Sequence, residues 1–200
     1  CARVGFGGIV EHWRKRNGGG VKIDWKPSPH FNRIPTREIK GIVIHTAECQ
    51  EKTGARWGIL SWLVSKLSKA SAHYIVDDQG IVQCVRDWDV AWHAGRVNDW
   101  TIGIELAGSA KQTSAQWDDA YSRAVLKNAA WLVAKLAAEH KIPIARLDDV
   151  GILMRSRGLF GHVDANRAHG KVGGGAHWDP GPNFPWDSFI SQCRDAQTCA

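Results

Sequence analysis

Side chains that ligate metals or carry protons gather late in the chain. Within 18 residues stand His162, Asp164, His169, His177 and Asp179. Imidazole nitrogen and carboxylate oxygen are both good zinc ligands, and a catalytic zinc site takes three protein ligands and leaves one position open. Pro180 keeps the preceding Asp179 out of the helical region of backbone conformation. The cluster indicates a candidate metal site, although histidine-rich loops are often merely polar, and spacing alone does not select three ligands.

Two apolar segments carry an imidazole and a carboxylate in positions that a sheet could bring together. Residues 41–45 are a β-branched run that closes on His45, and residues 101–106 alternate with period two and contain Glu105. Because successive side chains of a strand point to opposite faces, His45 lies on the face away from Ile44. Taken alone, His45 is better explained as a hydrogen-bonded strand-end histidine and Glu105 as a solvated glutamate, so a shared site depends on a third element.

The remaining pattern alternates between strands and helices. Helical spacing of apolar residues predicts a helix over about 54–69, and Asp78-Gln79-Gly80 predicts a hairpin between strands 73–77 and 81–85. The Thr113-x-x-Gln116 capping box predicts a long helix that reaches about Lys141. Residues 142–184 are expected to be rich in loops, with a last helix from near Pro185. We therefore expect an α/β fold, with one mixed central sheet flanked by helices and a groove at one sheet face.

The domain organisation follows from glycine content. Residues 1–24 are glycine-rich and basic, and we assign them to a linker or lead-in, with residues 25–200 as the catalytic domain. No signal peptide or membrane-spanning run is visible. Five cysteines without a CxxC pair argue against a disulfide scaffold, and Cys193 and Cys199 are read equally well as a pair or as free thiols.

The charge of the chain favours an acidic partner. A net charge of +6 suits nucleic acid, anionic lipid or a bacterial wall with acidic polymers. The basic residues are dispersed, with one small cluster at 14–16, so charge does not choose among these partners. Eleven tryptophans can serve the core or a ligand platform, and Trp92 and Trp178 stand beside candidate site residues.

Six segments together resemble the type-2 N-acetylmuramoyl-L-alanine amidases, a family that includes phage endolysins and animal peptidoglycan-recognition proteins. They occur in family order and cover about residues 25–190. The segments are Ile42-Val43-Ile44-His45-Thr46, Ser71-Ala72-His73-Tyr74-Ile75-Val76, Ala91-Trp92-His93-Ala94-Gly95, Thr101 to Gly108, Gly161-His162-x-Asp164 and His177-x-Asp179-Pro180-Gly181.

The resemblance implies a site and a reaction. It implies that His45, His162 and Asp179 hold a zinc ion, and that Glu105 is the general base that takes a proton from the attacking water. His177 stands where many relatives have a lysine that stabilises the oxyanion, a role open to an imidazole N–H donor. Trp92, His93 and Trp178 are expected to bind substrate in the groove. The implied reaction is hydrolysis of the muramoyl–L-alanine amide bond of bacterial peptidoglycan.

Two other functions fit parts of the pattern. One is a non-catalytic peptidoglycan-binding module, against which the presence of both Asp179 and Glu105 argues. The other is a metal-dependent nuclease, but no basic stripe with interleaved aromatic residues supports a nucleic-acid partner. We expect a monomeric phage endolysin domain, flanked by other domains, that is made in the host cytoplasm and acts at the cell wall.

Overall fold

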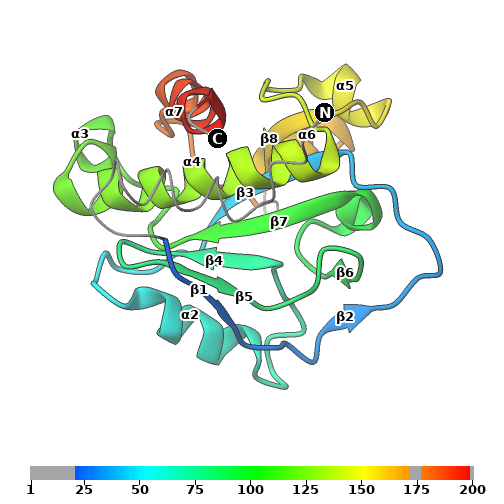
Figure 1. The fold of residues 1–200 in the computed structure, drawn as a ribbon, viewed down its shortest axis with the longest axis horizontal. Helices are drawn as coiled ribbons and strands as arrows, with labels where there is room; N and C mark the ends of the chain where they lie inside the picture. The colour runs from blue at the N-terminus through cyan, green and yellow to red at the C-terminus, as the bar shows by residue number, and fades with distance from the viewer. Residues whose placement is uncertain (1–20, 172–176, 199–200) are drawn as a thin grey trace, which may run out of the picture.

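The computed structural model describes residues 21–171 and 177–198, and its centre is a six-stranded mixed β-sheet (Figure 1). The strand order is β1-β5-β4-β7-β3-β8, and every neighbouring pair is parallel except β4 and β5, which form an antiparallel hairpin. The six strands are β1 (Ile23–Trp25), β3 (Gly41–Thr46), β4 (Tyr74–Val76), β5 (Ile81–Gln83), β7 (Thr101–Leu106) and β8 (Gly158–Gly161). Two short strands, β2 (Phe31–Asn32) and β6 (Val90–Ala91), form a separate antiparallel pair.

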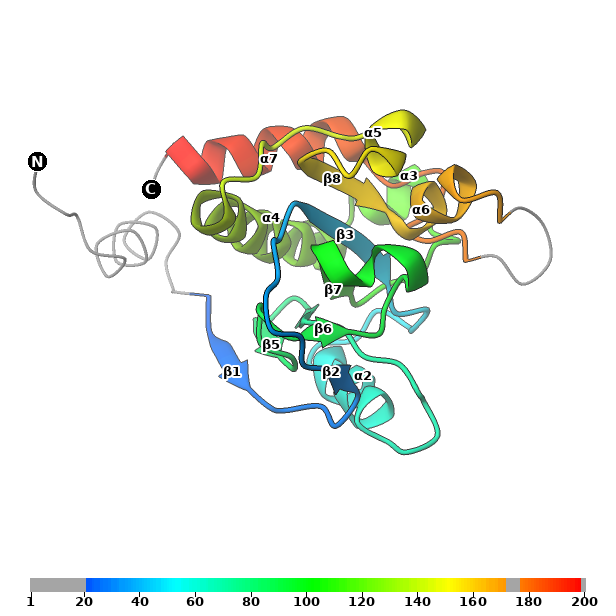
Figure 2. The same ribbon diagram turned by 90° about the vertical axis from the view of Figure 1, so that its right-hand side faces the viewer.

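Helices cover both faces of this sheet, as the two views show (Figures 1 and 2). On one face lies α4, with α7 packed along its outer side; on the other, α2 covers β4 and β5, and α6 lies against β3 and β8. The helices are α2 (Ala55–Leu63), the 3-10 helix η1 (Gly95–Trp100), α3 (Ser114–Trp117), α4 (Ala120–His140), α5 (Asp149–Leu153), α6 (His162–Ala168) and α7 (Trp186–Thr198). The predicted fold class is therefore confirmed.

The alternation of side chains along β3 separates the core from the site. Ile42 and Ile44 are fully buried in the cluster that α4 and α7 close, whereas Val43 packs in a different cluster with Phe160. His45 shares the face of Val43, as the period of two predicts. The parallel register of β3 and β7 places His45 directly beside Glu105. The sheet thus brings the predicted imidazole and carboxylate together on the face opposite α4.

Two helix boundaries differ from the predicted ones. The Thr113 capping box is present, but it caps the short α3, and the long helix α4 starts anew where the Asp119 side chain accepts from Ser122 N. The helix predicted over 54–69 ends at Leu63. Beyond it, the Ser68 hydroxyl donates to the backbone oxygens of Leu63 and Ser65, and such local bonds compete with helix continuation.

The segment 142–184 is more regular than predicted, because it contains α5, β8 and α6. The sequence of β8 hides its nature, since a four-residue strand with glycine at both ends has little strand propensity. Gly158 is required there by close approach: a Cβ would lie 2.8 Å from the Ala145 oxygen. Strand β8 is therefore stabilised by its pairing with β3 and by this close approach. Both are tertiary contacts, so the sequence of the segment itself does not predict the strand.

Three further expectations concern the lead-in segment, the cysteines and membrane-spanning helices. Strand β1 begins at Ile23, inside the segment assigned to the lead-in; residues 1–20 lie outside the described residues, so the linker assignment stays a prediction. Within the described residues Cys49, Cys84 and Cys193 are free thiols, and Cys199 falls outside them. None of the described helices has both the length and the apolar character that a membrane span requires.

Candidate metal centre

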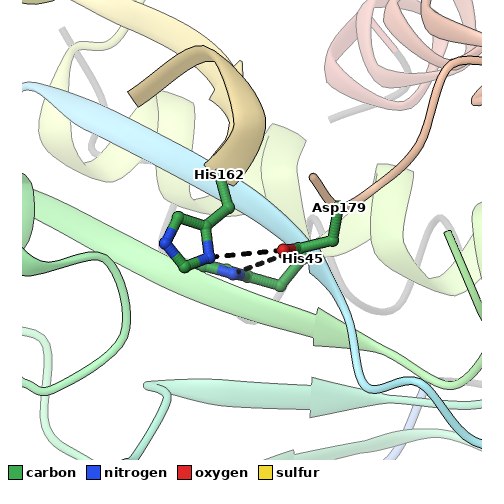
Figure 3. Close-up of side chains that lie close together, drawn as sticks. All are labelled: His45, His162 and Asp179. Carbon is green, nitrogen blue, oxygen red and sulfur yellow. Dashed lines mark hydrogen bonds and ion pairs between the residues drawn. The ribbon is translucent and has the colours of Figure 1, made fainter. Parts of the chain in front are cut away.

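Three side chains converge from separate elements at one end of the sheet (Figure 3). His45 lies at the end of β3, His162 is the first residue of α6, and Asp179 comes from the loop that leads to α7. His45 Nδ1 lies 2.9 Å from Asp179 Oδ2, and His162 Nδ1 lies 3.3 Å from Asp179 Oδ1. All three residues are buried, and their ligand atoms lie within 4.8 Å of one another.

His162 is positioned by the way in which α6 begins. The buried Asp164 carboxylate accepts from Gly161 N at 2.9 Å and thereby caps the helix. Arg146 and Arg167 both donate to the same carboxylate. Because three donors fix Asp164, the first turn of α6 presents His162 in a set direction.

Asp179 is positioned by the chain on either side of it. Its backbone oxygen accepts from Val163 N at 2.9 Å, which ties the loop to α6. Gly181 has a φ of 94°, and a Cβ at this position would lie 2.0 Å from the Ala110 oxygen. Only glycine fits this close approach, so the residues after Asp179 are held against the loop that follows β7.

The donor set suits zinc. With bonds of about 2.0–2.2 Å, the ligand atoms of a tetrahedral zinc lie about 3.3 Å apart, close to the separations between Asp179 and the two imidazoles. Burial alone would raise the pKa of the Asp179 carboxyl, but its contacts with His162 and His45 outweigh burial and lower it. Burial lowers the pKa of His162, which favours the neutral ring that a metal needs.

Glu105 stands beside this group as an isolated carboxylate. Its Oε1 lies 4.0 Å from His45 Nδ1, and its Oε2 is buried without a hydrogen-bond partner among the described residues. Burial raises the pKa of Glu105 to about 8, and the negative charges of Asp179 and Glu48 act in the same direction. A buried carboxylate with an unused oxygen, next to a set of metal ligands, is free to exchange a proton with a bound molecule.

His177 packs against His162 at the solvent-exposed side of the candidate metal centre. Its ring stacks on the His162 ring with centroids 4.4 Å apart and an interplanar angle of 14°. Its Nδ1 lies 3.7 Å from Asp179 Oδ1, and the side chain is 70% exposed. Burial of the stacked side and the neighbouring His162 lower the pKa of His177.

His93 contacts a candidate ligand directly. Its Nδ1 lies 3.1 Å from His45 Nε2, a pairing of residues 48 positions apart that the sequence does not reveal. Burial, with the neighbouring His45 and His73, lowers the pKa of His93 well below its ordinary value. This lowering favours the neutral ring, which also forms part of the groove wall.

A groove of about 530 Å³ opens over the centre. Its wall includes the predicted Trp92 and His93, whereas Trp178, with 45% of its surface exposed, lies outside the set of described residues that line the groove. Among the lining residues that the sequence did not single out are Trp62 of α2 and Lys171 after α6. Neither had a signal of its own, because exposed tryptophans and lysines are not distinguishable by spacing from other surface residues.

A second group of possible metal ligands, Asp87, Glu139 and His140, lies elsewhere in the structure. Both oxygens of Asp87 already have partners within the protein. Asp87 accepts from the Tyr74 hydroxyl at 2.6 Å and from Gln83 at 3.2 Å, and its other oxygen lies 3.0 Å from His140 Nε2. The His140 side chain, held by this pairing, is only 19% exposed. With its oxygens occupied, Asp87 is explained as a structural residue.

Comparison with known proteins decides the family. The family of N-acetylmuramoyl-L-alanine amidases matches residues 35–182, which include all three candidate ligands and Glu105. The chain belongs to this family. The prediction that the chain is an enzyme of this class is thereby confirmed.

Curated relatives of this amidase agree with that membership. N-acetylmuramoyl-L-alanine amidase A of Achromobacter lyticus is 29% identical over 177 residues, which cover 84% of this chain and 90% of the relative. The 1,6-anhydro-N-acetylmuramyl-L-alanine amidase AmpD of Haemophilus influenzae is 28% identical over 192 residues, with the same coverage. The Staphylococcus aureus hydrolase AmiA shares the fold, with a TM-score of 0.67 at 16% identity over 98% of this chain and 93% of AmiA.

Proposed function

We propose that this amidase is a zinc-dependent hydrolase that cuts the amide bond between N-acetylmuramic acid and L-alanine in bacterial peptidoglycan. The observation that carries the proposal is the convergence of His45, His162 and Asp179 beside the Glu105 carboxylate, within a groove. His45, His162 and Asp179 would hold the metal. When bound, zinc supplies a Lewis acid that polarises the scissile carbonyl and lowers the pKa of water from 15.7 to about 7.

Glu105 is the residue that moves the proton. Its carboxylate takes a proton from the attacking water and passes it to the leaving amine of L-alanine, as a general base and then a general acid. Burial raises the pKa of Glu105 to about 8, which makes its ionised form a stronger base and lets the carboxyl hold the proton until the amine leaves. The side chain is 16% exposed and lines the groove, so the carboxylate can reach the reactants.

The substrate contacts follow from the groove. We assign Trp92 and His93 to its wall and His177, with its exposed ring edge, to donation toward the oxyanion. Trp178 stays a proposed substrate contact from the sequence alone. A net charge of +6 suits attraction to acidic wall polymers.

The origin and assembly of the enzyme are further parts of the proposal. We propose that the enzyme acts at the cell wall. We further propose that it is a monomeric domain of a phage endolysin and that other domains flank it in the full-length protein. Purification from infected cells would test the origin, and light scattering of the purified chain would test the oligomeric state.

Two variants test the residue roles. Glu105→Gln should slow release of muropeptides about 10²–10⁴-fold while zinc binding persists. Asp179→Ala should lose both zinc binding and activity, because it removes a ligand. Zinc content by elemental analysis and muropeptide release from purified walls are the two measurements. Wild-type rates in both variants would contradict the assigned roles.

A further inference from the structure

The second nitrogen of His45 is part of a continuous hydrogen-bonded chain. His45 Nε2 lies 3.1 Å from His93 Nδ1, and the two rings meet edge to face at 88°. His93 Nε2 lies 3.3 Å from Thr101 Oγ1. The Thr101 hydroxyl in turn donates to the backbone oxygen of Val97 at 2.7 Å. The chain therefore joins the end of β3 to the 3-10 helix η1 through three side chains.

The last acceptor sets the direction of every bond in this chain. A carbonyl only accepts, so the single hydroxyl proton of Thr101 points to Val97, and Thr101 Oγ1 can only accept from His93. The one N–H of a neutral His93 then stands on Nε2, and its Nδ1 is an acceptor. His45 consequently donates from Nε2. Its Nδ1, which faces Asp179, keeps the lone pair that a metal requires.

The His93 ring packs directly against the backbone of Gly103. A Cβ on Gly103 would lie 2.5 Å from His93 Cγ and 2.6 Å from His93 Nδ1, so the ring occupies space that any other residue at position 103 would fill. His73 lies beside His93, with ring centroids 5.7 Å apart. His73 is itself fixed, because its Nδ1 accepts from Gly103 N at 3.0 Å. Gly103 and His73 therefore confine the His93 ring.

We propose that His93, seated on Gly103 and oriented by Thr101, is a positioning residue that holds His45 in the tautomer with a free Nδ1. This inference rests on the proposed function, in which His45 is a zinc ligand. Metal-binding histidines usually donate their other N–H to a carboxylate, carbonyl or water, and losing that partner costs about 10–100-fold in metal affinity or activity. Here the partner is a second histidine, whose own tautomer is set by a buried threonine.

A matched pair of variants at Thr101 tests the proposal without touching either histidine. Thr101→Val keeps the shape of the side chain and removes the acceptor, whereas Thr101→Ser keeps the hydroxyl. We expect Thr101→Val to bind zinc about 10-fold more weakly than wild type in a chelator competition, and Thr101→Ser to match wild type. Circular dichroism of the metal-free proteins checks that both are folded. If Thr101→Val does not fold, His93→Asn, which retains an acceptor near the Nδ1 position, should bind zinc more tightly than His93→Leu.

Nitrogen-15 NMR of the histidine rings provides a reading that is independent of affinity. The wild-type protein should carry the His93 proton on Nε2 in both its metal-free and zinc-loaded forms, and Thr101→Val should shift His93 toward the other tautomer. Equal zinc affinities across the Thr101 variants, or a His93 proton on Nδ1, would overturn the inference. A wild-type protein that binds no zinc would instead refute the proposed function, and the His93 tautomer would still decide the inference.

Discussion

At the scale of residues, each candidate ligand is fixed by a backbone contact close to it. His45 is fixed by strand register, His162 by the capped start of α6, and Asp179 by the bond from Val163 N to its oxygen. The side-chain chemistry and the family motifs predict these three residues from the sequence. Their distances from one another are not predictable, because His45 lies more than 100 residues before His162 and Asp179. The bond between His93 and His45 joins residues 48 positions apart and was not predictable, because it also depends on how separate segments pack together.

The Asp164 carboxylate provides a test of this support. Asp164→Ala should lower the free energy of unfolding by about 1–3 kcal/mol, because it leaves the buried Gly161 N–H without its partner and Arg146 without an ion pair. The control Asp149→Ala removes only the exposed partner of Arg167 and should cost at most about 1 kcal/mol. Urea unfolding of both variants checks the prediction, and equal losses would show that Asp164 is not a special support.

At the scale of elements, strands with a β-branched run or a clear period of two were predictable, and short glycine-rich ones were not. The β-branched run predicts the strand at 41–45 and the alternation predicts the strand at 101–106, and His45 lies on the predicted face of its strand, away from Ile44. Strand β8 was missed because its definition lies in parallel pairing with β3, a tertiary contact. The predicted long helix was real, but a second cap at Asp119 moved its start.

This second cap gives an element-scale prediction. Asp119→Ala should be less stable than Asp119→Asn by about 1 kcal/mol, because asparagine retains an oxygen for Ser122 N and alanine does not. Both variants remove the same charge, so repulsion between Asp119 and the neighbouring Glu51 cancels in the comparison. Thermal or urea unfolding measures the difference. Indistinguishable variants would mean that α4 does not depend on this cap.

At the scale of the whole molecule, the stability of the domain should decline in acid partly through Asp87. Burial opposes ionisation of Asp87, but bonds from His140 and Tyr74 outweigh it and lower its pKa in the folded protein. A folded-state pKa below the unfolded value means that the stabilisation is complete above about pH 4 and is lost as pH falls through the folded pKa.

The variant Asp87→Asn isolates this contribution. The difference in unfolding free energy between wild type and Asp87→Asn should have its full value above about pH 4 and should shrink as the pH falls further. Urea unfolding across this pH range measures the difference. A difference that stays constant from pH 7 to pH 3 would contradict the role given to the Asp87 charge.

Zinc-dependent amidase activity is also a property of the whole molecule, because it requires the groove together with its three proposed ligands. The most direct measurement is mass spectrometry of purified peptidoglycan after digestion by the chelator-treated protein, with and without added zinc. Without metal we expect no products, and with zinc we expect intact glycan chains and peptides that begin with a free L-alanine. New sugar reducing ends, or undiminished release of those peptides by the metal-free protein, would contradict this expectation.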